Sequence, residues 1–259
     1  MLFRKALLGL QFYKSRLRLV AMLLCATSAF WLLSSLAIHC DSQNASTPAV
    51  SSSDAEPGRQ QASDALTPTI KSEVLIIGDS MMQFGIGPAL KKGLESRGYS
   101  VEYFVKKSTG LTWTHFFDWQ YKSEELLSMG QFDVVIVMLG SNDGRWLKYQ
   151  GKRLEYGPNV DLWWQQYSLR FDEFYGRLCN ETRKVFWIGM PPMKPEGYHN
   201  KTRLFNAFYQ GKIQSSGCGT YIPTDYLSKD KPIRWSDGIH VSNSGGKMVA
   251  ERIIRDTGL

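Results

Sequence analysis

The stretch at positions 74–82 reads Val-Leu-Ile-Ile-Gly-Asp-Ser-Met-Met and decides how the rest of the chain is interpreted. Four consecutive apolar residues, three of them β-branched, predict a strand buried on both faces of a parallel sheet. A glycine turn ends the strand, and amphipathic, helix-like sequence follows from about Phe84. Ser80 therefore stands at the carboxyl end of a strand, where open α/β sheets place their chemistry and helix amides stabilise negative charge. The alternative is that Asp79 and Ser80 only cap the next helix.

From Glu73 onward, strand-like and helix-like segments alternate. The predicted strands are Glu73–Gly78, Tyr99–Val105, Phe132–Leu139, Lys184–Gly189 and Thr220–Pro223. The predicted helices are Phe84–Arg97, Val160–Cys179, Thr202–Gln214 and Ser244–Asp256. This alternation predicts one α/β domain over residues 71–259, with a mostly parallel sheet covered by helices on both faces.

The composition is that of an ordinary globular protein, with 43% hydrophobic and 21% charged residues among 259. The net charge of +7 is concentrated in residues 1–18, where five basic residues precede any acid. Subtracting these five leaves about +2 for the rest of the chain, and no basic stripe with interleaved aromatic residues stands out. The charge therefore gives no reason to expect nucleic acid as a partner.

Residues 19–39 form an apolar stretch of membrane-spanning length after the basic segment 1–18. The positive-inside rule predicts a single-pass signal anchor in the inner (cytoplasmic) membrane, with everything after His39 in the periplasm or outside the cell. A cleaved signal peptide is the alternative, because Ser-Leu-Ala at 35–37 resembles a cleavage site. Residues 40–70, rich in Ser, Ala and Pro, predict a disordered tether that buries too little surface to fold.

Two of the four cysteines, Cys179 and Cys218, lie in the predicted folded part. Each ends a helical segment directly before a predicted strand, so neighbouring parallel strands would bring both to the amino-terminal edge of the sheet. An oxidising compartment permits a disulfide between them, and two buried thiols are the alternative. Neither cysteine has partners at metal-ligand spacing, and His39, His115 and His199 form no ligand set, so no metal and no cofactor is expected.

Three further segments contain candidate site residues. After the second strand, Gly110 lets the backbone approach a ligand closely. After the third, Asn142 offers an amide that can donate to an oxyanion, although a simple turn is the alternative. Asp237 stands three residues before His240, just ahead of the closing helix. That spacing lets the carboxylate reach the ring Nδ1 and leaves Nε2 free as a base.

Together these residues resemble the SGNH hydrolases, also called the GDSL esterases. Gly-Asp-Ser-Met at 78–81 matches the nucleophile block, and Gly110 the glycine of the second block. Gly-Ser-Asn-Asp at 140–143 and Asp-Gly-Ile-His at 237–240 match the third and fourth blocks, in the family's order. The resemblance covers roughly residues 73–256 and implies a three-layer sandwich with a mostly parallel five-stranded sheet of the flavodoxin-like type.

The resemblance also implies a role for each site residue. Ser80 attacks an ester carbonyl, His240 takes the proton and later gives it to the leaving alcohol, and Asp237 orients His240. The backbone N–H groups of Ser80 and Gly110, with the Asn142 amide, form the oxyanion hole. No metal or cofactor is required for this chemistry.

We therefore expect a membrane-anchored serine esterase that removes O-acyl groups, above all O-acetyl, from a cell-envelope glycan. Trp113 and Trp146 fit a sugar ligand because rings stack on sugar faces, although packing under long loops is the alternative. An O-acetyltransferase would use the same triad and would need a membrane acyltransferase partner to deliver acyl groups. A lipase or thioesterase, and a glycan-binding scaffold on an inactivated hydrolase fold, are further alternatives. The scaffold is disfavoured because it has no need of all four of the intact residues Ser80, Asp237, His240 and Asn142.

Overall fold

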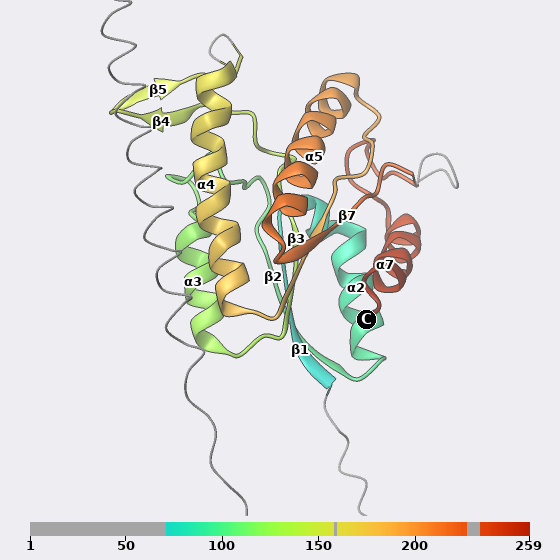
Figure 1. Ribbon diagram of the computed structural model, residues 1–259. Coiled ribbons are helices and arrows are strands. Elements are labelled where there is room, and N and C mark those ends of the chain that lie inside the picture. The colour runs from blue at the N-terminus through green and yellow to red at the C-terminus, as the bar shows by residue number, and fades with distance from the viewer. Residues whose placement is uncertain (1–70, 158–159, 227–233) are drawn as a thin grey trace, which may run out of the picture. The chain divides into compact units, whose positions relative to one another are not determined.

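The computed structural model (Figure 1) describes residues 71–157, 160–226 and 234–259. The N-terminal segments predicted from the sequence lie outside the described residues: the basic segment 1–18, the anchor 19–39 and the tether 40–70. Among the helices of the described part, none combines the length and apolarity needed to cross a membrane.

Five parallel strands form the central sheet in the order β2-β1-β3-β6-β7. Their bounds are β1 Lys71–Gly78, β2 Tyr99–Val105, β3 Val134–Met138, β6 Lys184–Ile188 and β7 Gly219–Ile222. The predicted parallel five-stranded sheet is thereby confirmed. The strand order reverses at β1, between its neighbours β2 and β3, and ligands of open α/β sheets bind at such a switch point.

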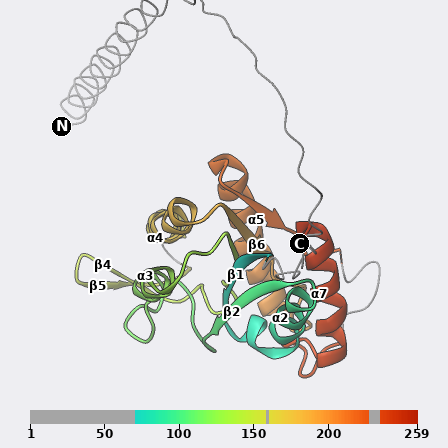
Figure 2. The same cartoon turned by 90° about the horizontal axis from the view of Figure 1, so that it is seen from below.

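Helices cover both faces of the sheet, as the two views in Figures 1 and 2 show. Their bounds are α2 Gly87–Glu95, α3 Trp119–Met129, α4 Val160–Glu181, α5 Glu196–Ser216 and α7 Asn243–Thr257. Side chains alternate along β1, so Val74 and Ile76 pack with α2 and α7, whereas Leu75 and Ile77 pack with α3, α4 and α5. This confirms the three-layer sandwich.

The predicted helix Phe84–Arg97 is interrupted near its start. A short π-helix, η1 (Met82–Ile86), precedes α2, with extended backbone at Phe84 and a positive φ of 75° at Gly85. A Cβ at Gly85 would lie 2.5 Å from the carbonyl oxygen of Val241, so only glycine permits both the conformation and the contact. The kink therefore seats the turn after Ser80 against the segment that contains His240.

Two elements of the structure were not predicted. One is α3, whose sequence lies partly in an aromatic stretch without clean periodicity. The other is an antiparallel hairpin of β4 (Leu147–Tyr149) and β5 (Lys152–Leu154). Its turn places Gln150 and Gly151 at positive φ angles of 48° and 77°, as two-residue hairpin turns require. Both elements lie on the face of the sheet covered by α4 (Figure 2).

Cys179 and Cys218 are joined by a disulfide, with their Cα atoms 5.8 Å apart. Cys179 lies near the end of α4, before β6, and Cys218 lies directly before β7. Because β6 and β7 are neighbouring parallel strands, the bridge is at the amino-terminal edge of the sheet, opposite the edge that bears Ser80. The two bridged cysteines are 39 positions apart in the sequence.

Replacing both cysteines with serine is expected to lower the free energy of unfolding by about 3–4 kcal/mol, because the unfolded chain regains the freedom of a long loop. Urea unfolding with and without a reductant measures the effect. The reductant should shift the midpoint of the wild-type chain and leave that of the double variant unchanged. A wild-type midpoint insensitive to the reductant would contradict a stabilising bridge.

Candidate active site

Ser80 lies two residues after the end of β1, in the turn that leads into η1. Asp79 shapes this turn: its Oδ1 accepts a hydrogen bond from the backbone N–H of Met81 at 2.8 Å. The backbone oxygen of Asp79 accepts another from the N–H of Gln83 at 3.0 Å. The turn leaves the Ser80 side chain partly exposed at the carboxyl edge of the sheet.

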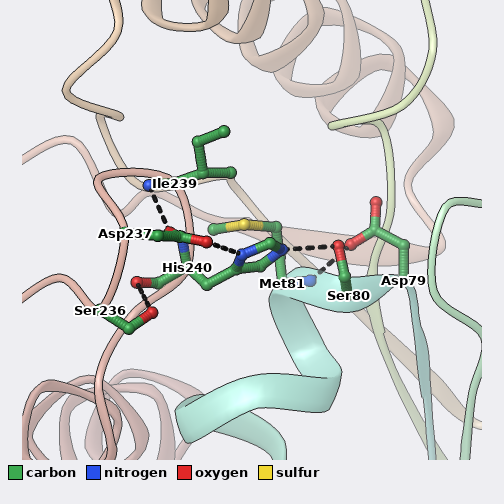
Figure 3. Close-up of polar contacts among 7 residues, drawn as sticks. All are labelled: Asp79, Ser80, Met81, Ser236, Asp237, Ile239 and His240. Atoms are coloured by element: carbon green, nitrogen blue, oxygen red, sulfur yellow. Dashed lines mark hydrogen bonds and ion pairs between the residues drawn. The ribbon is translucent and has the colours of Figure 1, made fainter.

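His240 and Asp237 complete a chain of short polar contacts with Ser80 (Figure 3). His240 Nε2 lies 3.0 Å from Ser80 Oγ, and His240 Nδ1 lies 2.7 Å from Asp237 Oδ2. A carboxylate at Nδ1 favours the tautomer that has its proton there, so Nε2 is left to accept the serine proton. Sequence reasoning placed these residues at separate points of the chain, and the structure brings all three together.

The loop from Trp235 to Val241 sets the geometry of the acid and the base. An antiparallel bridge between these two residues closes it. Within it, Asp237 Oδ1 accepts hydrogen bonds from the backbone N–H groups of His240 at 2.7 Å and Ile239 at 2.9 Å. These bonds and the one from the His240 ring hold the pKa of Asp237 well below its usual range. The carboxylate therefore stays ionised, with one oxygen fixed by the backbone and the other facing the ring.

The Asn142 amide joins the loops that follow β1, β2 and β3. Its Nδ2 donates to Asp79 Oδ2 at 3.1 Å and to the carbonyl oxygen of Thr109 at 3.0 Å. Ser141 Oγ is a third acceptor at 3.1 Å, so the two hydrogens of the amide are shared among three acceptors. Asn142 therefore lies beside Asp79, the residue before Ser80, and its amide connects the loops.

Gly110 lies against the buried carboxyl group of Asp143. A Cβ at Gly110 would be 2.5 Å from Asp143 Oδ1, an oxygen that accepts the backbone N–H of Thr112 at 2.9 Å. The other oxygen of Asp143 accepts the hydroxyl of Tyr167 at 2.8 Å. Burial raises the pKa of Asp143 in spite of these bonds. The need for glycine here therefore comes from Asp143, which holds the loop after β2 against the loop after β3.

Asp79 is a fully buried carboxyl group next to Ser80 in the chain. Burial raises its pKa to about 6, against the opposing hydrogen bonds from the Ser141 hydroxyl, the Met81 N–H and the Asn142 amide. The bond from Ser141 is the shortest of these, at 2.6 Å. Ionisation of Asp79 therefore destabilises the folded state. The three hydrogen-bond donors make this destabilisation smaller.

This raised pKa predicts how stability depends on pH. Folded Asp79 binds its proton more tightly than the unfolded chain does, so its contribution is fully present below about pH 4 and lost as the pH rises through about 6. A shift of about two pKa units corresponds to about 3 kcal/mol. Between pH 4 and 8, the unfolding free energy of the wild-type chain should therefore fall by about this amount relative to Asp79→Asn. Urea unfolding across that range tests it, and parallel profiles would contradict it.

Trp113 and Trp146, the two tryptophans predicted to bind sugar, both contact the ring of His115. The ring centroids are 5.2 Å apart for Trp113 and 5.0 Å apart for Trp146, which stacks on His115. Trp113 and His115 belong to the loop after β2, and Trp146 belongs to the loop after β3. The structure therefore joins both tryptophans in one aromatic cluster.

Sequence reasoning did not single out Phe84 as a site residue. Its ring meets the His240 ring edge-on at 5.2 Å and is 43% exposed. Phe84, Asp237 and His240 help to line an open groove of about 570 Å³. The available signal was an exposed aromatic residue in the opening turn after Ser80, which is too common to identify a site.

Residues 73–256 match the family described as "Protein of unknown function (DUF459)". No curated protein matches the chain. Among solved structures, a catalytic mutant of Axe2, an acetylxylan esterase from Geobacillus stearothermophilus, is 14% identical with a TM-score of 0.53. LAE5, an alpha/beta hydrolase enzyme from the metagenome of Lake Arreo, Spain, is 16% identical with a TM-score of 0.51. Each match covers 73% of this chain and 95% of the other, which shows a shared fold.

Proposed function

This chain belongs to the DUF459 family and has the fold of the SGNH hydrolases, and on that premise we propose that it is a serine ester hydrolase. The observation that supports this most is the 3.0 Å contact of Ser80 Oγ with His240 Nε2, continued by the 2.7 Å contact of His240 with Asp237. A hydroxyl, a base and an orienting acid in this order activate a nucleophile.

In the proposed reaction, Ser80 Oγ attacks the ester carbonyl carbon while His240 Nε2 takes its proton. The tetrahedral intermediate collapses as the imidazolium gives that proton to the leaving sugar hydroxyl, and an acyl-enzyme remains at Ser80. A water molecule then gives a proton to His240 and attacks the acyl carbon. The second tetrahedral intermediate collapses as His240 passes that proton to Ser80 Oγ, which releases the carboxylic acid and restores Ser80. Asp237 stabilises the imidazolium in both steps.

The proposed oxyanion hole consists of the backbone N–H groups of Ser80 and Gly110 with the Asn142 amide. Asn142 would have to exchange its bond to Asp79 or Thr109 for one to the oxyanion. Each such donor contributes about 3–4 kcal/mol to the transition state.

We propose an O-acetyl group on a carbohydrate as the substrate, within a glycan of the cell envelope. Axe2, which shares the fold, is an acetylxylan esterase. Three of the matching Axe2 structures are catalytic mutants that replace an aspartate, a histidine or a serine with alanine. These are the residue types found here at positions 237, 240 and 80. The exposed ring of Phe84 beside His240 offers a flat apolar surface to a sugar.

The proposed location is the outer side of the cytoplasmic membrane, with residues 19–39 as the anchor and 40–70 as the tether. The apolar stretch and its basic flank support the anchor. The disulfide of Cys179 and Cys218 supports an oxidising compartment for the domain.

Incubating the full chain with p-nitrophenyl acetate and a neutral glycan oligomer tests hydrolysis against transfer. Mass spectrometry should detect free acetate as the main product, and Ser80→Ala should form no more of it than buffer alone. Acetylated oligomer outpacing free acetate would replace hydrolysis with acetyl transfer by the same triad. If the nitrophenolate release were equal in wild type and Ser80→Ala, the serine ester chemistry would be wrong.

A further inference from the structure

A second groove, of about 300 Å³, lies between the loop after β2 and the β4–β5 hairpin. The residues that line it come from both segments: Thr112, Thr114, His115, Trp146, Lys148, Gly151, Lys152 and Arg153. None of them lines the groove beside His240. We propose that this hairpin groove binds an acidic sugar unit of the acetylated glycan, a proposal that rests on the proposed function.

The aromatic side of the hairpin groove consists of flat rings. Trp146 stacks on His115 with only 21° between the ring planes, and Trp113 meets the same His115 edge-on. The guanidinium of Arg153 lies over the Trp146 ring, 4.7 Å from its centroid. The aromatic side of the groove thus carries a guanidinium held over a ring, and that cation fits a sugar unit that bears a negative charge.

The charged side of the groove is cationic. Lys148, Lys152 and Arg153 line it, all three are exposed, and no acidic residue is among the lining residues. Arg153 pairs with Glu155 at 3.1 Å, but both side chains are more than half exposed, so water weakens this pair. The groove therefore keeps an excess of positive charge.

The register of the hairpin adds an independent argument. β4 and β5 pair Lys148 directly with Arg153. Directly opposed residues of an antiparallel pair share one face of the hairpin, where two like charges destabilise it. A carboxylate or phosphate between them would turn this repulsion into two attractive contacts. Binding of an anionic ligand would therefore remove the repulsion between Lys148 and Arg153.

Several contacts link the loop after β2, which lines the hairpin groove, to the loop after β3, which carries Asn142. Asp143, directly after Asn142, accepts the N–H of Thr112, and the Arg145 guanidinium lies 4.3 Å from the Trp113 ring centroid. Arg170 of α4 donates to the carbonyl oxygen of Thr112 at 3.2 Å. These contacts hold the loops after β2 and β3 together from Asn142 to the hairpin. An oligosaccharide with its acetyl group at Ser80 would thus extend toward the cationic groove.

Lys148→Glu tests the proposal without weakening the hairpin, because it replaces a like-charged cross-strand pair with an attractive one. The KM of the full chain would be measured for an acetylated oligouronide, an acetylated xylo-oligosaccharide of equal length, and p-nitrophenyl acetate. We expect the variant to raise KM for the oligouronide about fivefold to tenfold, with kcat and the other two substrates unchanged. High salt should reduce the difference between variant and wild type.

Lys92→Glu is the matched control, because it makes the same charge change at an exposed residue of α2, on the other face of the sheet. An equal loss with the neutral oligomer, or the same loss in Lys92→Glu, would overturn the proposal.

A binding measurement keeps this proposal separate from the proposed function. Calorimetry on full-length Ser80→Ala should show that Lys148→Glu weakens binding of deacetylated oligouronide, or of a phosphate-bearing oligosaccharide, but not of the neutral oligomer. The arm that binds more tightly identifies carboxylate or phosphate as the anion. Failure of both acidic oligomers to bind more tightly than the neutral one would overturn the hairpin groove alone. Absence of p-nitrophenyl acetate hydrolysis in the wild type would overturn the esterase alone.

Discussion

Replacing Ser80 with alanine is expected to lower kcat for p-nitrophenyl acetate by about 10⁶-fold, the loss seen when a subtilisin-type triad loses its serine. Without Oγ there is no atom to form the acyl-enzyme, so His240 and Asp237 have nothing to activate. The change removes a partly exposed hydroxyl whose contact is with His240 at 3.0 Å, so no core packing is lost. Thermal unfolding of the variant should therefore match that of the wild type.

Ser128→Ala is the matched control for this prediction. Ser128 is an exposed serine of α3, and its hydroxyl donates to the backbone oxygen of Glu125 at 2.7 Å. It should keep the turnover of the wild type. Wild-type turnover in Ser80→Ala, by contrast, would mean that another group is the nucleophile.

Asp237→Asn is expected to lower kcat by about 10⁴-fold, the loss known for the same change in a trypsin-type triad. The structure gives the reason. Oδ1 of Asp237 accepts the backbone N–H groups of Ile239 and His240, so the asparagine oxygen would take that place. The asparagine NH₂ would then face Nδ1 of His240 and force the proton onto Nε2. An imidazole with its proton on Nε2 cannot accept the proton of Ser80.

The steady-state rate with p-nitrophenyl acetate measures this loss, and Asp172→Asn provides the control. Asp172 is an exposed acid of α4 that pairs with Lys212, so its amide variant should keep full activity. Turnover of Asp237→Asn within tenfold of the wild type would show that another group orients His240.

The sequence predicted the sheet well because its strands are short, strongly apolar runs that end in turn residues. The predicted bounds of β2, Tyr99–Val105, are those of the structure. β1, β3, β6 and β7 differ by one or two residues at their ends. The predicted ends of the buried strands also place Ser80 and Asn142 at one edge of the sheet.

Other elements depend on interactions that the local pattern does not contain. α3 begins after Asp118, whose side chain accepts the N–H of Gln120, but its buried Trp119 falls in a run of aromatic residues that obscured the helical period. β4 and β5 have three residues each, too few for an alternation to be recognised. α5 starts at Glu196 rather than Thr202, because its first turns are polar and follow Pro195.

The inner part of the site could not be predicted either, because it depends on contacts between distant loops. Gly110 was expected to approach a ligand, and the structure shows Asp143 in that space. Asn142 was expected to face an oxyanion, and its amide bonds Asp79 and Thr109. Residue types and spacing identify the members of a site more readily than the direction of each side chain.

Ser80 and His240, the proposed nucleophile and its base, are separated by 160 positions in the chain. Ser80 follows the first strand, whereas His240 precedes α7, the last helix described, which packs on η1 and α2. During synthesis, the serine leaves the ribosome long before the histidine exists, so a nascent or truncated chain contains an alcohol without a base. A proteolytic cut that releases the segment 234–259 would have the same effect. The proposed hydrolytic activity thus requires the contact between the first and last parts of the domain. Contacts between residues so far apart in the sequence form slowly during folding.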